Sequence, residues 1–373
     1  MECIYYCRAG YEADLQQELQ TKLGLLGQYG YAKFKKNQAL LTFDITSINA
    51  KPDASNMLNA LLQRTPALSS LVFARQKLAL LCHIDLPDED RITPIIEALQ
   101  KYDVSYFGDI VVEYADTEDG KQIAKFCKKF TVPLRNHLRK SGLLTKNPRE
   151  DKAYVHLLFA TSKRCALCLS HPQDRSHYPL GVKRLKMPVD SPSRSVLKLD
   201  EAIHSFFNVD QKNALFQPGM QATDLGACPG GWSYQLVQLG LSVEAVDHGL
   251  IQTELMQTGK VKHFSEDGFL YQPQQGNVDW LVCDMIEQPT RVSELMLKWL
   301  IKGWANACIF NLKLPMNKRS KVVFPILEHI QKTLSDQFGD SIVQAKHLYH
   351  NRDEVTVLII VNSQLVSGYT ENL

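Results

Sequence analysis

A tight glycine-rich turn between a short strand and a helix restricts the folds open to this chain. The turn runs from Asp224 to Trp232 and reads Asp-Leu-Gly-Ala-Cys-Pro-Gly-Gly-Trp. Its glycines, Gly226, Gly230 and Gly231, have no Cβ atom and tolerate positive φ, so the backbone can come close to a ligand. The helix that follows offers unpaired N–H groups and the positive end of its dipole. We therefore expect a ligand at this turn.

The spacing of the glycines, G-x-x-x-G-G, discriminates between ligand classes. It matches neither the dinucleotide fingerprint G-x-G-x-x-G nor a Walker loop, which needs Gly-Lys-Ser/Thr. Acids follow the next three apolar runs, at Asp247, Asp267 and Asp284. In doubly wound sheets, an acid at the first of these places accepts hydrogen bonds from ribose hydroxyls. A turn without phosphate-binding chemistry favours a nucleoside without phosphate, and S-adenosylmethionine fits because carboxylates can meet its ribose, ammonium and adenine edge.

The order of expected elements in residues 195–373 indicates a parallel sheet with helices on both faces. Strands are expected at 243–246, 281–283, 308–312, 346–349 and 355–361, and helices at 197–207, 295–304 and 323–334. In such sheets ligands bind at the carboxyl ends of the strands. We therefore predict an α/β, Rossmann-like domain whose site lies at that edge.

The turn resembles the first motif of FtsJ-like ribose 2′-O-methyltransferases, and the resemblance covers roughly residues 190–362. The Lys-Asp-Lys-Glu tetrad of that family matches, in chain order, Lys198, Asp284, Lys313 and Glu354. The resemblance implies a class I S-adenosylmethionine-dependent methyltransferase. The predicted cofactor-binding residues are Ser195, Asp224, Gly226, Cys228, Pro229, Gly230, Gly231, Trp232, Asp247, Asp267 and Asp284.

Methyl transfer from a sulfonium requires the hydroxyl oxygen, the methyl carbon and the sulfur to lie in line. The ribose hydroxyl must also lose a proton, and we assign Lys313 as the base. An efficient base needs its pKa lowered by roughly two to three units from about 10.4. We expect Lys198 and the positive sulfur of the donor to lower it. Lys198 also positions the hydroxyl, while Asp284 and Glu354 orient the two lysines.

Three other reactions and one binding role are alternatives to ribose methylation. Methylation of base amino groups uses an Asn/Asp-Pro-Pro-aromatic loop, which is absent at Asp284-Met285-Ile286-Glu287. Cytosine C5 methylation needs a nucleophilic cysteine, and strand alternation turns Cys283 away. The glycine spacing disfavours a nicotinamide oxidoreductase. A non-catalytic RNA-binding ribosome-assembly factor on the same fold stays as the alternative.

The net charge of +2 conceals a segregation of charge along the chain. Residues 121–200 contain 18 Lys and Arg against 5 Asp and Glu, a net of +13, so the remainder carries −11. Such a stretch is typical of polyanion binding, and we predict RNA as the partner. The side chains expected to meet phosphates are Lys125, Lys128, Lys129, Arg135, Arg139, Lys140, Lys146 and Arg149.

The N-terminal half divides into three predicted parts. Residues 1–60 suggest a β-α-β ferredoxin-like unit, and the mixed order in residues 61–170, with a strand at 71–74, resembles an RNA-binding THUMP domain. Pro133 predicts a break near Thr131 in the long helical stretch. Residues 171–194 form a basic, proline-rich linker that we expect to guide RNA. The whole chain resembles bacterial enzymes that methylate the ribose of a cytidine in 23S ribosomal RNA, cytidine 2498.

Composition sets further expectations. Hydrophobic residues make up 45% of the chain, yet no apolar run approaches the length of a membrane span or forms a signal peptide, so we expect a cytoplasmic, non-membrane protein. The nine cysteines are expected to be reduced, and Cys165 and Cys168 to be structural thiols rather than metal ligands. We expect a monomer. The residues alone do not identify the target nucleotide, nor whether naked RNA or a pre-ribosomal particle is the substrate.

Overall fold

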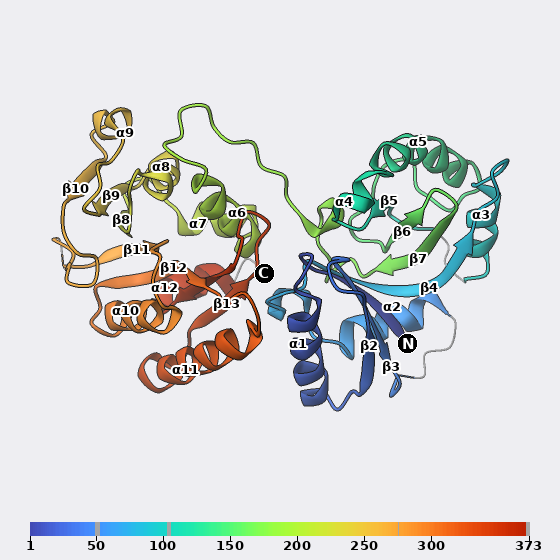
Figure 1. Cartoon of the computed structure of the whole chain (residues 1–373), viewed down its shortest axis with the longest axis horizontal. Helices are drawn as coiled ribbons and strands as arrows, with labels where there is room; N and C mark the ends of the chain where they lie inside the picture. The colour runs from blue at the N-terminus through green and yellow to red at the C-terminus, as the bar shows by residue number, and fades with distance from the viewer. Residues whose placement is uncertain (49–52, 103–105, 275, 371–373) are drawn as a thin grey trace. The chain divides into compact units, whose positions relative to one another are not determined.

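The computed structural model describes residues 1–48, 53–102, 106–274 and 276–370, and it separates the chain into two compact units (Figure 1). Unit 1 comprises Met1–Lys183 and unit 2 comprises Arg184–Leu373. Each unit is built around one sheet of seven strands among the described residues.

The sheet of unit 1 has the strand order β2-β3-β1-β4-β7-β6-β5. Its strands are β1 (Glu2–Tyr6), β2 (Gly30–Lys33), β3 (Leu40–Ile45), β4 (Gln76–Asp85), β5 (Asp109–Tyr114), β6 (Tyr154–Thr161) and β7 (Arg164–Ser170). Its helices are α1 (Glu12–Leu25), α2 (Ala54–Gln63), α3 (Thr93–Gln100), α4 (Glu118–Lys121) and α5 (Ala124–Lys140), with short 3-10 turns η1 (Leu68–Ser70) and η2 (Pro179–Gly181). Strand β1 pairs with β4, so one sheet continues from the ferredoxin-like part into the part that follows it.

Two local predictions for unit 1 are wrong. Helix α5 continues through Pro133, because Pro133 lies on the exposed side while Phe130, Leu134 and Leu138 keep an unbroken buried stripe against the sheet. The missing N–H of proline therefore leaves only a solvent-facing carbonyl unpaired. Residues 71–74 are buried but form no strand, since the N–H groups of Val72 and Phe73 donate to the carboxylate of Glu18.

The first part of the predicted linker is packed onto unit 1 through a buried carboxylate. Glu113 of β5 accepts hydrogen bonds from the Leu180 N–H at 2.6 Å and the Tyr6 hydroxyl at 2.9 Å. Nδ1 of His156 lies 2.9 Å from the same carboxylate, and its Nε2 lies 2.9 Å from Oγ of Ser170. Burial opposes ionisation of Glu113, but His156 and the hydrogen bonds outweigh it, so the pKa of this carboxyl is lowered.

The sheet of unit 2 has the order β10-β9-β8-β11-β12-β14-β13. Its strands are β8 (Gln221–Leu225), β9 (Ser242–Val246), β10 (Val261–Phe264), β11 (Val278–Cys283), β12 (Ala305–Lys313), β13 (Ile342–Lys346) and β14 (Glu354–Ile360). Its helices are α6 (Val196–Phe206), α7 (Val209–Leu215), α8 (Gly231–Gln238), α9 (Thr253–Gln257), α10 (Pro289–Ile301), α11 (Ser320–Phe338) and α12 (Ser363–Thr370). Strands β8 to β12 are mutually parallel where they pair, and β14 runs antiparallel to both β12 and β13. This is the predicted α/β fold.

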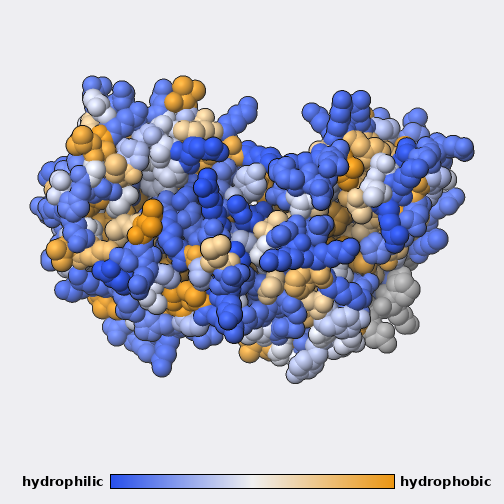
Figure 2. Space-filling model, in the orientation of Figure 1, coloured by the Kyte–Doolittle hydropathy of each residue, from blue (hydrophilic) through white to orange (hydrophobic). Residues whose placement is uncertain are grey.

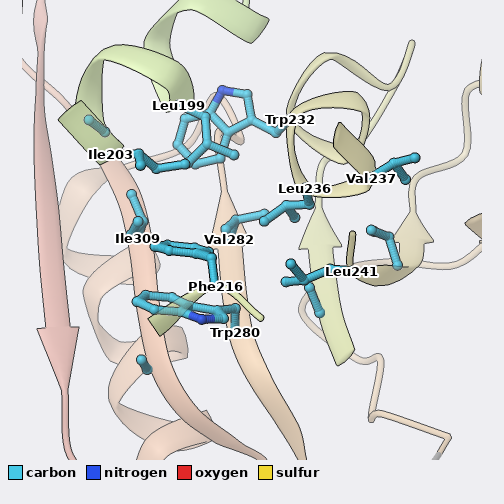
Figure 3. Close-up of a cluster of buried hydrophobic side chains, with 14 of the residues drawn as sticks. Leu199, Ile203, Phe216, Trp232, Leu236, Val237, Leu241, Trp280, Val282 and Ile309 are labelled. Carbon is cyan, nitrogen blue, oxygen red and sulfur yellow. The ribbon is translucent and has the colours of Figure 1, made fainter. Parts of the chain in front are cut away.

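Apolar side chains from α6 and α8 pack on one face of this sheet. Figure 3 shows Leu199 and Ile203 of α6 beside Val282 and Ile309 of the central strands. Beneath them the rings of Phe216 and Trp280 are stacked with centroids 4.4 Å apart. The core therefore fixes α6, which carries Lys198, against the strands that carry the other tetrad residues.

The strand predicted at 346–349 is wrong, because β13 occupies Ile342–Lys346. Residues 347–353 form a loop instead, with the N–H groups of Tyr349 and His350 donating to the Glu201 carboxylate at 2.7 Å. None of the described helices has both the length and the apolar character needed to cross a bilayer. The face shown in Figure 2 is mostly hydrophilic, with isolated apolar side chains.

Replacing Glu113 with Ala leaves three buried donors without an acceptor, so we expect a loss of roughly 3–5 kcal/mol in the unfolding free energy of unit 1. Urea unfolding followed by circular dichroism measures it. Glu118→Ala is the matched control, because the Glu118 side chain is 89% exposed and its ion pair with Lys121 contributes little. Equal unfolding midpoints for the two variants would contradict the anchoring role of Glu113.

Candidate active site

The tetrad residues come together because their strands end, or begin, at one edge of the sheet. Asp284 directly follows β11, and Lys313 is the last residue of the parallel strand β12. Strand β14 runs the other way, so its first residue, Glu354, lies opposite Lys313 in the register. Lys198, in the first turn of α6, completes the group.

The two amines and two carboxylates alternate in a closed arrangement. Nζ of Lys313 lies 2.7 Å from Asp284 Oδ1 and 2.5 Å from Glu354 Oε2. Nζ of Lys198 lies 2.9 Å from Asp284 Oδ2 and 2.6 Å from Glu354 Oε1. Each amine therefore contacts both acids. The side chains of Lys198 and Lys313 keep 20% and 22% of their exposure, so the group is accessible at one side.

The electrostatics of Lys313 differ from the sequence-based expectation. Burial opposes the charge on its ammonium, but Asp284 and Glu354 outweigh burial and raise its pKa above the ordinary value. Burial likewise disfavours the Asp284 carboxylate, but Lys313, Lys198 and a hydrogen bond from Asn311 outweigh it and lower its pKa. The expected lowering of the Lys313 pKa is not found in the protein alone, because two acids at contact distance outweigh burial.

A chain of buried hydrogen bonds, which the sequence analysis missed, ends at the Asp284 carboxylate. Nδ2 of Asn311 donates to Asp284 Oδ1 at 2.8 Å, and Oδ1 of Asn311 accepts from the Thr356 hydroxyl at 2.7 Å. That hydroxyl accepts from Nδ2 of Asn351 at 2.8 Å. Asn311, Thr356 and Asn351 are all fully buried. This chain gives Asp284 an uncharged hydrogen-bond donor, and it holds one carboxylate oxygen in position.

Glu201 ties α6 to the loop that leads into β14. One oxygen accepts from the Tyr349 N–H, and the other accepts from the His350 N–H and lies 2.7 Å from Nδ1 of His350. Glu201 is one turn after Lys198, so the contact fixes the element of Lys198 relative to the loop before Glu354.

The glycine turn forms a close-packed cradle at the same edge. A Cβ atom on Gly226 would lie 2.5 Å from Cγ of Met285, and Gly230 has a φ of 113°. A Cβ on Gly231 would overlap the hydroxyls of Ser193 and Ser195, which lie 2.7 Å apart. Only glycine lets these segments approach so closely. Cys228 and Pro229 are exposed on the turn, whereas Trp232 is 2% exposed and belongs to the core.

The four predicted acids have different surroundings. Asp224 is 1% exposed beneath the turn, where it accepts from the Ser233 hydroxyl at 2.7 Å, and burial raises its pKa to about 7. Asp247 is half-buried and accepts from the N–H groups of Cys228 and Gly249 at 3.0 and 2.8 Å. It thus shapes the turn, and each oxygen retains acceptor capacity toward a ribose.

Asp267 is exposed after β10 and accepts from the Phe269 N–H at 2.9 Å. Asp247, Asp267 and Asp284 therefore follow three strands of one sheet, as predicted, whereas the buried Asp224 carboxylate faces α8 and is not displayed on the turn. A contact between Asp224 and a cofactor stays a prediction.

Two cysteines, Cys228 and Cys283, lie near the site in unit 2, and Cys165 and Cys168 belong to unit 1. Cys283 is fully buried, and burial raises its thiol pKa to about 12. The exposed Cys228 directs its thiol to the Leu250 carbonyl at 3.4 Å. Cys165 and Cys168 are buried in β7, and the described residues contain no group of side chains suited to a metal ion.

Comparisons with known proteins place the chain in a family. Three family models match the chain: the RlmM ferredoxin-like domain at residues 1–78, the N-terminal region of ribosomal RNA large subunit methyltransferase M at 90–171, and FtsJ-like methyltransferase at 192–345. Ribosomal RNA large subunit methyltransferase M from Shewanella sp. (strain W3-18-1) is 46% identical, covering 94% of this chain and 95% of its own. The same-named protein from Vibrio atlanticus is 43% identical over 95% and 96% of the two chains.

The chain belongs to the ribosomal RNA large subunit methyltransferase M family. Members of this family carry an FtsJ-like, S-adenosylmethionine-dependent methyltransferase domain, here in unit 2. The residues fit that cofactor, because the glycine cradle, the half-buried Asp247 and the exposed Asp267 lie at the edge that also holds the tetrad. Gly226, Gly230, Gly231, Asp247 and Asp267 would hold the cofactor, which supplies the activated methyl group.

Asn311→Leu removes the uncharged donor to Asp284, so we expect the methyl-transfer kcat to fall at least about tenfold at an unchanged KM for the methyl donor. Steady-state kinetics with labelled donor measure both constants. Asn306→Leu is the control, because Asn306 lies in the same strand but contacts Asn277 and Asn362 at the far end. If both variants lost activity equally, general damage to β12 would explain the loss.

Proposed function

We propose that this protein transfers a methyl group from S-adenosylmethionine to the ribose 2′-hydroxyl of a cytidine in 23S ribosomal RNA, with cytidine 2498 as the target suggested by family resemblance. The observation that carries the proposal is the alternation of Lys198 and Lys313 with Asp284 and Glu354, at contact distances, beside the glycine cradle. The Asn/Asp-Pro-Pro-aromatic loop typical of base amino methylation is absent at Asp284–Glu287, and Cys283 is buried.

We assign one role to each side chain. Lys313 acts as the general base toward the hydroxyl, and Lys198 positions that hydroxyl while adding positive charge beside it. Asp284 and Glu354 hold both amines in fixed directions, and Asn311 holds Asp284. The tetrad is electrically neutral with both lysines charged. The positive sulfur of a bound donor therefore favours loss of one ammonium proton. This offsets the rise in the Lys313 pKa that the two acids cause.

The RNA partner is supported by side chains on α5. Lys125, Lys128, Lys129 and Lys140 are exposed there and can meet phosphates. Arg135 is held by two hydrogen bonds to Asp109, so it serves the fold rather than the phosphates. Arg149 is likewise paired with Asp151.

Further proposals concern the location, oligomeric state and domain organisation of the protein. We place the protein in the cytoplasm as a monomer, acting on large-subunit RNA or on a pre-ribosomal particle. Its organisation is taken as a ferredoxin-like domain at 1–60, a THUMP-like domain at 61–170, a basic linker at 171–194 that contacts RNA, and the methyltransferase domain at 195–373.

Lys313→Ala removes the base, and we expect labelled methyl incorporation into 23S RNA to fall at least about a thousandfold, with donor affinity largely retained. Methyl incorporation is measured by counting labelled methyl groups on RNA retained on a filter. Donor affinity is measured by calorimetry. Lys302→Ala, at an exposed position after α10, should behave as wild type. Full turnover by Lys313→Ala would contradict the assignment of Lys313 as the base. A wild-type protein that bound RNA without turnover would instead favour the assembly-factor alternative.

The pH dependence of methyl transfer tests the state of Lys313. The rate rises with pH as the Lys313 ammonium loses its proton, and Asp284 and Glu354 raise that pKa. Glu354→Gln removes one of the two negative charges, so the pKa of Lys313 falls and the rising limb should move about one pH unit lower. Single-turnover rates across pH measure the limb, with the exposed Glu294→Gln as control. A limb that stayed in place or moved higher would contradict the assignment.

A further inference from the structure

An exposed row of rings follows the edge strand β2 of unit 1, far in sequence from the basic stretch of residues 121–200. Strand β2 is the outermost strand at one end of the sheet. The side chains of Tyr29, Tyr31 and Phe34 are 67%, 48% and 37% exposed. Three large rings on the surface within six residues are unusual, because apolar and aromatic groups normally gain free energy by burial.

The backbone of β2 directs part of this row to one side of the sheet. Side chains alternate along a strand, so Tyr31 and Lys33 face the same side, roughly 6.6 Å apart, while Tyr29 directly precedes the strand. The Lys33 ammonium lies 5.0 Å from the centroid of the Tyr31 ring. Exposed rings within and beside an edge strand, next to a lysine, match the way single-stranded RNA binds on sheets, where unpaired bases stack on aromatic side chains.

The charge of the segment favours a polyanion. Residues 19–43 contain four lysines and no acid. Lys33 pairs with Glu2 at 3.1 Å. Lys35 and Lys36 are exposed and form no ion pair with any part of the chain that the structure describes.

Protection of the sheet edge accounts for only part of this pattern. Lysines on an edge strand discourage pairing with another chain. Exposed rings have the opposite effect, because they add apolar surface to an unpaired edge. The rings of Tyr29, Tyr31 and Phe34 therefore need a different explanation from the lysines alone.

We propose that residues 29–36 bind a single-stranded segment of RNA, with the rings stacking on unpaired bases and Lys33, Lys35 and Lys36 meeting phosphates. The inference rests on the proposed RNA substrate and adds to it a second contact outside the methyltransferase unit. It also specifies the form of that RNA, since stacking on these rings requires bases that are not paired.

The double variant Tyr29→Ser with Tyr31→Ser tests the stacking. Fluorescence anisotropy with a labelled short oligouridine should show binding weakened roughly tenfold for each ring removed, whereas binding of a duplex RNA of equal length should be unchanged. The variant Tyr29→Phe with Tyr31→Phe keeps the rings and should bind as wild type. Leu25→Ser, at a position 83% exposed in the same unit, controls for loss of apolar surface.

The lysines are tested separately through salt dependence. Replacing Lys33, Lys35 and Lys36 with Ser should reduce the slope of log affinity against log salt by about 2, because each phosphate contact on a single strand contributes about 0.7. The tyrosine variants should weaken binding without changing that slope. These opposite signatures separate stacking from charge.

Methyl transfer by the same variants separates failure of this inference from failure of the proposed function. If wild type methylates a ribose in 23S RNA while the tyrosine variants bind oligouridine unchanged, residues 29–36 do not bind single-stranded RNA. If those variants lose activity only on a particle that carries ribosomal proteins, the row contacts protein, and the inference is again overturned. A wild type without ribose methylation overturns the proposed function, while oligouridine binding still tests the row.

Discussion

The reversal of β14 beside β12 is the constraint on which the site depends. Parallel strands alone would deliver Asp284 and Lys313 to one edge, but they could not supply a second acid from the start of a strand. Because β14 runs antiparallel, its first residue, Glu354, is the register partner of the last residue of β12, Lys313. A one-residue slip of β14 would turn Glu354 to the other face and leave Lys313 with one acid. The buried pairing of Asn311 with Thr356, two positions along the same strands, holds that register.

Each of the four tetrad side chains has a charged form that burial disfavours. An isolated lysine or carboxylate at this depth would shift its pKa toward the neutral form. In the closed arrangement each amine contacts two carboxyl groups, and the formal charges of two lysines and two acids sum to zero. Neutrality makes the arrangement sensitive to one added charge. A lysine held by two acids is a poor base on its own, and it becomes a better one when further positive charge is bound nearby.

Local motifs explain how much of this could be predicted from sequence. The glycine turn and the acids at strand ends are local signals, and the resemblance supplied the tetrad in order. Asn311 was missed although a signal exists, since it is the one polar residue in the run 307–312 and lies two residues before Lys313, on the same face. The sequence holds no comparable signal for Glu201, because its partners are backbone N–H groups nearly 150 residues away. The break predicted near Thr131 was wrong because Pro133 lies outside the apolar stripe that Phe130, Leu134 and Leu138 continue.

The continuity of the first sheet determines how the two proposed RNA contacts of unit 1 relate to one another. The exposed rings lie on β2 at one end, and α5, with its exposed lysines, is bonded through Arg135 to Asp109 of β5 at the other. Seven strands spaced about 4.8 Å apart place these two edges roughly 29 Å from each other. One RNA that contacts both must therefore reach across the width of the sheet. A single-stranded segment at β2 next to a folded segment at α5 would satisfy this geometry, because an unpaired strand can extend where a helix cannot bend.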